Sequence, residues 1–381
     1  IVYLNGNQVL EHVGGYLPFN VNLSDKGIQA GDSCLIAVMV DNSEDKNFPP
    51  GKRQYTLDFT YHGGIYRDVW MIAKSSIGIT DVIDENRVAG GGIFVHFDQI
   101  SEKSADVYVN TEVKNKSNRA HTVTVETTLA DFQSIPMKKV SKNLTLKPGE
   151  IRTIIQKIVV KNPHLWSPES PYLYRVQSRI KSGREALDGG ITRVGIRSFA
   201  FDSKVGFKLN GKPYGQLVGA NRHQDFAYVG NAVPNSQQWR DAKRLRDAGC
   251  TIIRTAHYPQ DPSFMDACDE MGLFVIVATP GWQYWNKDPK FAEWVHRNTR
   301  EIIRRDRNHP SVLMWEPILN ETRYPLDFAL EALQITKDEY PYPYRPIAAA
   351  DVHSAGVADN YDVVYGWPGD DEKAEKPKQC I

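Results

Sequence analysis

Apolar and polar positions alternate along the first half of the sequence and form longer, helix-like repeats in the second half. Between residues 76 and 199, alternation occurs in 105–113, in 123–129 and in 151–160, with turn residues between these segments. Alternation with this period is typical of strands that bury one face. Because the strands are short and evenly spaced, the pattern predicts an immunoglobulin-like β-sandwich over residues 76–199.

Residues 1–75 also show a pattern that is typical of short strands. Apolar runs at 1–4, 8–12 and 33–41 are followed by turn signals, which include Asn-Gly, Gly-Gly and Pro-Pro-Gly. Glycine and proline at such points end a strand or reverse the chain. The pattern therefore predicts a second region of β-sandwich before residue 76.

From residue 200 onward the pattern changes to strand, loop and helix in repetition, which predicts a parallel sheet. Strands are expected at 214–220, 251–255, 273–278, 312–315, 347–350 and 362–365. Helices are expected at 236–248, 262–272, 291–303 and 326–335.

Two folds are built from such repeats, an open doubly wound sheet and a closed (β/α)8 barrel. The open fold usually carries a glycine-rich phosphate loop after its first strand, and Gly-Ala-Asn-Arg-His at 219–223 is not such a loop. We therefore expect a (β/α)8 TIM barrel over residues 200–381. It is incomplete, because the sequence predicts six strands where a closed barrel has eight.

Polar and aromatic side chains follow the predicted strands one after another. Barrel active sites lie at the carboxyl ends of the strands, so these side chains should share one rim. Carboxylates, amides and imidazoles bind sugar hydroxyls, and aromatic rings pack on sugar C–H faces. The metal motifs HxH and HExxH are absent, so no metal site is expected. The candidate sugar ligands are His223, Asp225, His257, Trp282, Asn320, Glu321 and Trp367.

Each candidate also has a purely structural interpretation. His257 can cap a strand, and Trp282 and Trp367 can be core aromatics. Arg254 can be a buried ion-pair partner that holds other groups of the site. The recurrence of such groups at the same end of successive strands favours the functional interpretation.

Glu321 is the strongest candidate for chemistry, because it follows Asn320 after the apolar strand 312–315. A carboxyl group at the mouth of an apolar barrel can stay protonated near neutral pH, as a general acid requires. The alternatives are a capping or surface carboxylate, and Glu316 is a rival on the same strand. Since Pro317 follows Glu316, we expect Glu316 to lie lower in the barrel with a structural role.

Charge and composition narrow the classes of function. Lys plus Arg and Asp plus Glu both number 46, so no global field favours nucleic acid or an anionic membrane as partner. The sequence has no apolar run long enough for a spanning helix and no signal peptide, so a soluble chain is expected, with periplasm and cytoplasm both left open.

The scattered cysteines are expected to be free thiols. The oligomeric state is left open, a homo-oligomer included.

Several strings along the chain resemble glycoside hydrolase family 2, the β-galactosidase and β-glucuronidase family. The resemblance implies the C-terminal part of a sugar-binding-type jelly roll at 1–75, an immunoglobulin-like domain at 76–199 and a catalytic barrel at 200–381. The strings are Gly-Gly-Ile-Tyr-Arg-Asp-Val at 63–69, Leu-Trp-Ser-Pro-Glu-Ser-Pro-Tyr-Leu-Tyr at 165–174, Gly-Ala-Asn-Arg-His at 219–223, Arg-Thr-Ala-His-Tyr-Pro at 254–259, Asn-His-Pro-Ser-Val-Leu-Met-Trp at 308–315 and Asn-Glu at 320–321.

The resemblance also implies roles for single residues. By position, Glu321 matches the acid/base of the family, and Asn320 matches the amide that binds the 2-OH beside the reacting carbon. His257 matches a histidine that faces the sugar, and Asp225 an acidic residue directed at sugar hydroxyls. The nucleophile of the family is a second glutamate on the seventh strand, which we expect to lie outside this sequence. No organic cofactor is implied.

The implied activity is that of a retaining exo-β-glycosidase. A terminal β-linked galactose is the first expectation for the substrate, and a β-glucuronide is the nearest alternative. A different class stays open, namely a non-catalytic carbohydrate-binding protein on a degenerate barrel. We also expect residues 1–381 to be catalytically silent by themselves, because the predicted strands do not close a barrel.

Overall fold

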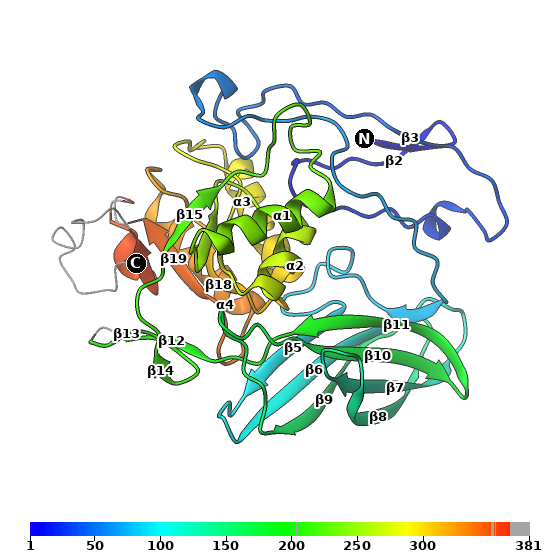
Figure 1. The fold of residues 1–381 in the computed structure, drawn as a ribbon. Coiled ribbons are helices and arrows are strands. Elements are labelled where there is room, and N and C mark those ends of the chain that lie inside the picture. The colour runs from blue at the N-terminus through cyan, green and yellow to red at the C-terminus, as the bar shows by residue number, and fades with distance from the viewer. Residues whose placement is uncertain (203, 352–353, 355, 366–381) are drawn as a thin grey trace.

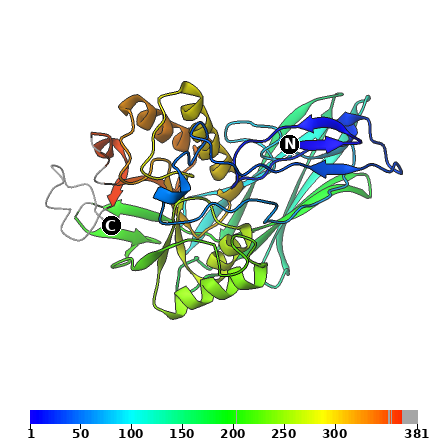
Figure 2. The same ribbon diagram turned by 90° about the horizontal axis from the view of Figure 1, so that it is seen from above.

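A computed structural model describes residues 1–202, 204–351, 354 and 356–365 (Figure 1). The chain forms a pair of β-sheets and a curled parallel sheet flanked by helices, and the N-terminal segment lies alongside the parallel sheet and its helices. Seen from above, part of the blue N-terminal segment passes over the parallel sheet and its helices (Figure 2). No helix in the described ranges is long and apolar enough to span a membrane.

Two antiparallel sheets make up residues 77–194, as the alternating pattern predicts. One sheet contains β4 (Ile77–Ile79), β5 (Ile93–Asp98), β6 (Ser104–Asn115) and β9 (Ile151–Lys161), and the other contains β7 (His121–Ala130), β8 (Pro136–Leu146), β10 (Tyr174–Ser182) and β11 (Glu185–Val194). Along β9 every second side chain from Ile154 to Val160 is buried. Ile158 and Val160 pack in a core to which Val176 of the other sheet contributes, so the two sheets face each other.

The parallel sheet that the second half of the sequence predicts is confirmed (Figure 1). Its six strands, in sequence order across the sheet, are β15 (Gly219–Arg222), β16 (Ile252–Thr255), β17 (Phe274–Ala278), β18 (Val312–Glu316), β19 (Ile347–Asp351) and β20 (Val363–Tyr365). Four helices connect them, α1 (Asn235–Asp247), α2 (Pro262–Met271), α3 (Pro289–Asp306) and α4 (Leu326–Glu339). Since side chains alternate between the faces of a strand, Ile253, Val275 and Val277 pack against the first three helices.

Two of the helices begin at the aspartate–proline pairs of the sequence. The carboxylate of Asp261 accepts a hydrogen bond from the backbone N–H of Ser263, and Pro262 begins α2. Asp288 caps α3 in the same way, with Pro289 as the first helical residue. An acidic N-cap followed by proline satisfies the free N–H groups of a first turn, so these short motifs fix where both helices start.

A small antiparallel sheet covers the amino-terminal ends of the barrel strands. Its strands are β12 (Phe199–Asp202), β13 (Gly206–Leu209) and β14 (Lys212–Pro213). Phe207 packs with Ile252 and Phe274, which are the first residues of β16 and β17. The small sheet therefore forms an apolar floor at the end of the barrel opposite to the predicted rim.

The first barrel strand begins later than the pattern predicts. The apolar run at 214–220 predicts a strand, whereas β15 begins at Gly219. Gly215 has a φ of 92°, a conformation that interrupts an extended chain. Tyr214 and Leu217 instead pack against the apolar floor. The apolar run is therefore a floor segment in its first part and a strand only at its end.

The N-terminal segment contains one three-stranded sheet among its described residues, in the order β2 (Asn7–Leu10), β1 (Val2–Leu4) and β3 (Ile36–Val38). The rest is largely irregular and contacts the rim of the barrel. Tyr16 stacks on Tyr258, with ring centroids 4.7 Å apart. Arg67 donates hydrogen bonds to Gln224 at 3.2 Å and to the carbonyl of Pro259 at 2.9 Å. This segment thus forms part of the wall beside the carboxyl ends of the strands.

The expectation of free thiols holds for the described cysteines. Cys268 is buried in α2, and Cys34 and Cys250 are partly exposed, each without a disulfide. Cys380 lies outside the described residues.

Candidate active site

The carboxyl ends of the parallel strands carry the side chains that the sequence predicts at a rim. The described members are, in chain order, His223, Asp225, His257, Trp282, Asn320 and Glu321. Ring centroids are 5.9 Å apart for His223 and His257, and 5.5 Å apart for His257 and Trp282. Gln283, next to Trp282, donates a hydrogen bond to Glu321. The predicted residues therefore form one continuous arc, and Trp367 lies outside the described residues.

A buried ion pair lies beneath this arc. Arg254 donates from Nε to Oε2 of Glu316 at 2.8 Å and from Nη2 to Oε1 at 2.6 Å. Glu316 is fully buried, and its Oε1 also accepts a hydrogen bond from the hydroxyl of Tyr365. Burial lowers the pKa of Arg254, but the charge of Glu316 outweighs it, and the net shift of the pKa is upward. Glu316 is therefore buried in an ion pair, as the structural role expected for it implies, and Arg254 fits the alternative interpretation as an ion-pair partner.

The same arginine orients Asn320. Nη2 of Arg254 donates to Oδ1 of Asn320 at 2.8 Å. The amide oxygen is thus engaged by a group that can only donate, which identifies the other amide atom as the nitrogen. The N–H groups of Asn320 are therefore the ones left for a ligand, and they can bind a hydroxyl oxygen.

Glu321 lies in a different environment from the one that the sequence pattern predicts. An apolar barrel mouth was expected to enclose its carboxyl group, but the side chain is exposed. The buried stretch continues only through Ile318 and Leu319, and Glu321 lies beyond it in the left-handed conformation, with a φ of 55°. Its backbone N–H donates to Oδ2 of Asp351 at 3.0 Å, and its carboxylate accepts from Gln283. Polar contacts, rather than apolar enclosure, define its position.

His257 is a neutral group within the arc. Its ring is buried and stacks on Trp282 with 1° between the ring planes. Burial lowers its pKa to about 2, and the charges of Arg254, His223 and Lys52 act in the same direction. A neutral imidazole has one donor and one acceptor nitrogen, so His257 can exchange hydrogen bonds with a hydroxyl group.

The N-terminal segment contributes site residues that the sequence analysis missed. Phe59 is buried and stacks on His223, with ring centroids 5.1 Å apart. The ammonium nitrogen of Lys52 lies 3.9 Å from the ring centroid of Trp282. These residues are far from the barrel in sequence, so strand-end position could not identify them. The string at 63–69 was the one signal that this segment belongs with the barrel.

Asp225 lies at the outer end of the arc beside an open hollow. Its carboxylate is exposed, and Oδ2 lies 3.7 Å from Nε2 of His62. The hollow has a volume of about 630 Å³, and Tyr66, Phe226 and Tyr228 contribute to its lining. Asp225 can therefore be reached by a ligand from this side.

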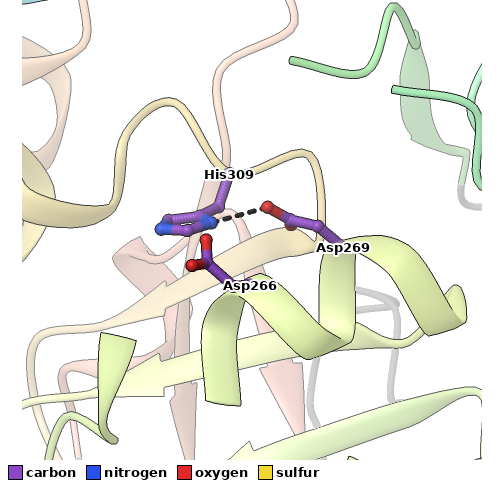
Figure 3. Close-up of side chains that lie close together, drawn as sticks. All are labelled: Asp266, Asp269 and His309. Atoms are coloured by element: carbon purple, nitrogen blue, oxygen red, sulfur yellow. Dashed lines mark hydrogen bonds and ion pairs between the residues drawn. The ribbon is translucent and has the colours of Figure 1, made fainter. Parts of the chain in front are cut away.

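A second cluster of ionisable groups lies at the other end of the strands. Figure 3 shows Asp266 and Asp269, both on α2, pointing toward His309. Nδ1 of His309 lies 2.6 Å from Oδ2 of Asp269, and Oδ1 of Asp269 accepts from the backbone N–H of Ser311 at 3.0 Å. Burial lowers the pKa of His309, but Asp269 dominates together with other acidic groups and raises it to about 9. Asp269 thus binds both His309 and the backbone of Ser311, and so connects α2 to the turn before β18.

The parallel sheet and its polar rim place the chain in the class of barrel proteins that carry their functional groups at the carboxyl ends of the strands. Comparison with family models identifies the family within this class. Residues 203–376 match the model of the TIM barrel domain of glycosyl hydrolases family 2, and residues 88–197 match a second model of the same family. The chain belongs to glycoside hydrolase family 2.

Known relatives carry two activities in their names. The β-galactosidase of Thermoanaerobacter pseudethanolicus is 35% identical over 335 residues, which cover 88% of this chain and 42% of that protein. The β-glucuronidase of Bacteroides fragilis is 28% identical, over 92% of this chain and 50% of that protein. The structure of Bacteroides uniformis β-glucuronidase 2 covalently bound to cyclophellitol-6-carboxylate aziridine matches with a TM-score of 0.83 and 29% identity, over 96% of this chain and 45% of that chain. This chain spans half or less of each relative.

Proposed function

We propose that this chain carries the acid/base part of the active site of a retaining exo-β-glycosidase. Glu321 is the general acid and base, and Asn320 binds the 2-OH of the sugar. One observation carries the proposal: the Asn320–Glu321 pair follows β18, held by hydrogen bonds from Arg254 and to Asp351, in a chain of glycoside hydrolase family 2. The intact pair argues against the alternative of a non-catalytic carbohydrate-binding barrel.

The mechanism has two steps. In the first, a carboxylate nucleophile attacks the anomeric carbon while Glu321 gives its proton to the departing glycosidic oxygen. In the second, Glu321 takes a proton from the water that displaces the nucleophile. Retention requires the two carboxyl groups to be about 5 Å apart. The nucleophile is expected on a strand beyond the six described here.

Other residues of the arc bind the sugar in this proposal. His257 is neutral, so it can accept from one hydroxyl and donate to another. The exposed carboxylate of Asp225 accepts from hydroxyl donors, and His223 lies between these two residues along the arc. Trp282 supports His257 through its stacked ring. Sugar stacking on Trp282 and Trp367 stays a prediction.

The preferred substrate is a terminal β-galactoside. The relative at 35% identity is named a β-galactosidase, which supports this choice. A β-glucuronide is the second candidate, supported by the likeness to a β-glucuronidase bound to a carboxylate-bearing aziridine. The ratio of kcat/KM for p-nitrophenyl β-galactoside and β-glucuronide, measured on the full gene product, decides between them.

The proposal includes a domain assignment. Residues 1–75 are the C-terminal part of a jelly roll, residues 76–199 an immunoglobulin-like domain, and residues 200–381 the catalytic barrel. The two facing antiparallel sheets at 77–194 support the second assignment. The contacts of Arg67 with Gln224 and Pro259 support an N-terminal domain that forms a wall of the site.

Replacing Glu321 with alanine in the full gene product tests the central role. General acid catalysis contributes about 10²–10⁴-fold, so kcat/KM should fall by that factor for an unactivated disaccharide. For an aryl glycoside with an acidic phenol, kcat/KM should change little, because the phenol departs without a proton. Glu293→Ala, at an exposed position on α3, is the matched control. Equal losses on both substrates would remove Glu321 from the role.

A further inference from the structure

Gln283 lies between a cation and the proposed acid/base. It follows Trp282 in the loop after β17, and its Oε1 accepts a hydrogen bond from Nζ of Lys52 at 2.7 Å. Its Nε2 donates to Oε2 of Glu321. No motif of the sequence analysis includes Gln283 or Lys52, and neither has a role in the mechanism above.

The chemistry of Lys52 fixes which way the amide of Gln283 points. An ammonium group has three donors and no acceptor, so only the amide oxygen can face it. The amide NH2 must then face Glu321. Lys52 is itself held in place, because its ammonium lies over the ring of Trp282, a favourable cation–π position.

A second hydrogen bond ties the same two loops together. The backbone N–H of Gln283 donates to Oγ1 of Thr322 at 2.9 Å, and this hydroxyl donates to the carbonyl of Asn320 at 3.1 Å. Gln283 therefore binds the segment 320–322 through its backbone N–H, which contacts Thr322, and through its side chain, which contacts Glu321. The two contacts restrain both the position and the rotation of the Glu321 carboxyl group.

We propose that Gln283, oriented by Lys52, is a positioning residue that determines which oxygen of Glu321 carries the catalytic proton. Because an N–H group can only donate, Oε2 of Glu321 stays an acceptor and the proton resides on Oε1. The described residues give Oε1 no hydrogen bond, so this oxygen is free to approach the glycosidic oxygen. The inference rests on the proposed role of Glu321.

The test uses the full gene product with Gln283→Ala, Lys52→Met and Lys52→Arg. Two controls remove similar surface contacts far from the site. Gln334→Ala removes an amide donor to Asp338, at 2.8 Å, and Lys212→Met removes an ammonium donor to Glu102, at 2.6 Å. Both controls should leave kcat/KM unchanged on both substrates, and melting temperatures show that each variant is folded.

Gln283→Ala should lower kcat/KM about 10-fold to 100-fold for an unactivated disaccharide, the usual effect of one hydrogen bond to a charged group. For an aryl glycoside with an acidic phenol the loss should stay below about threefold, since no proton is needed. Lys52→Met should give a smaller loss of the same kind, and Lys52→Arg should retain the kcat/KM of the parent on both substrates.

Two results would overturn the inference while the role of Glu321 stands. These are equal losses on both substrates for Gln283→Ala, or a parent-like kcat/KM on the disaccharide for both Gln283→Ala and Lys52→Met. If instead Glu321→Ala itself showed no preference for acidic leaving groups, the proposed function would fail first. The two failures are therefore distinguishable in one set of assays.

Discussion

Replacement of Arg254 by methionine should destabilise the barrel strongly and disturb the site above it. The guanidinium makes two hydrogen bonds to Glu316, whose side chain is 0% exposed. Methionine removes the positive charge and leaves a buried carboxylate without its partner. Breaking a buried pair in this way costs about 3–5 kcal/mol. For a domain of this size that cost lowers the melting temperature by about 6–20 °C.

A double-mutant cycle separates the ion pair from the rest of the packing. Glu316→Gln also breaks the pair, because it removes the negative charge. Arg254 then keeps a buried positive charge without a partner. The double variant leaves no unpaired charge, so its loss of stability should be smaller than the sum of the two single losses. Arg152→Met, at an exposed arginine that pairs with Glu150, is the control and should change stability by less than about 1 kcal/mol.

The assay is differential scanning calorimetry of the full gene product, combined with kcat/KM. Arg254→Met should also lower kcat/KM at a temperature where the variant is folded, because Asn320 loses the donor that orients its amide. A melting temperature within 2 °C of the parent for Arg254→Met, or additive losses in the cycle, would refute the assignment of Arg254 and Glu316 as a stabilising buried ion pair beneath the site.

Three further predictions concern other parts of the chain. His309 has a pKa of about 9 against an ordinary 6.5, so its pairing contributes about 3 kcal/mol to the free energy of unfolding below pH 6.5, and this contribution is lost as the pH rises through 9. Urea unfolding measured against pH should show this loss for the parent and not for His309→Gln. An equal loss in both proteins would contradict the pairing. Asp225→Asn should lower kcat/KM about tenfold with an unchanged melting temperature, and the reverse outcome would favour a structural role. Gly272→Ala should lower the melting temperature more than Gly149→Ala. Both glycines have a φ of 73°, but only at Gly272 would a Cβ lie 2.2 Å from the carbonyl oxygen of Pro168. Equal shifts of the melting temperature would contradict this contact.

Much of the fold could be predicted from the sequence, because local pattern and burial agree. The alternation in 105–113, 123–129 and 151–160 corresponds to β6, β7 and β9. The strand predicted at 214–220 was wrong in its first part, because an apolar run has the same composition whether it pairs in a sheet or packs on a floor. Only the turn at Gly215 and the partners of Tyr214 distinguish the two.

The candidate site could be predicted only as far as it follows strand ends. The position of Asn320 and His257 at the rim could be predicted in this way, since a parallel sheet brings its carboxyl ends together. Lys52 and Phe59 reach the site from a largely irregular segment, and no periodicity encodes such a long-range contact. The exposure of Glu321 was also missed, because it depends on how far the loop carries the residue beyond the buried end of β18.

The most direct test of the account is the reaction of Glu321→Ala, in the full gene product, with sodium azide and an aryl β-glycoside that has an acidic phenol. Without its base this variant should accumulate the glycosyl-enzyme, which azide can attack because it needs no deprotonation. The account predicts that azide accelerates turnover and that NMR identifies the product as the β-glycosyl azide. Absence of rescue in an otherwise active variant, or an α-glycosyl azide, would contradict Glu321 as the acid/base of a retaining glycosidase.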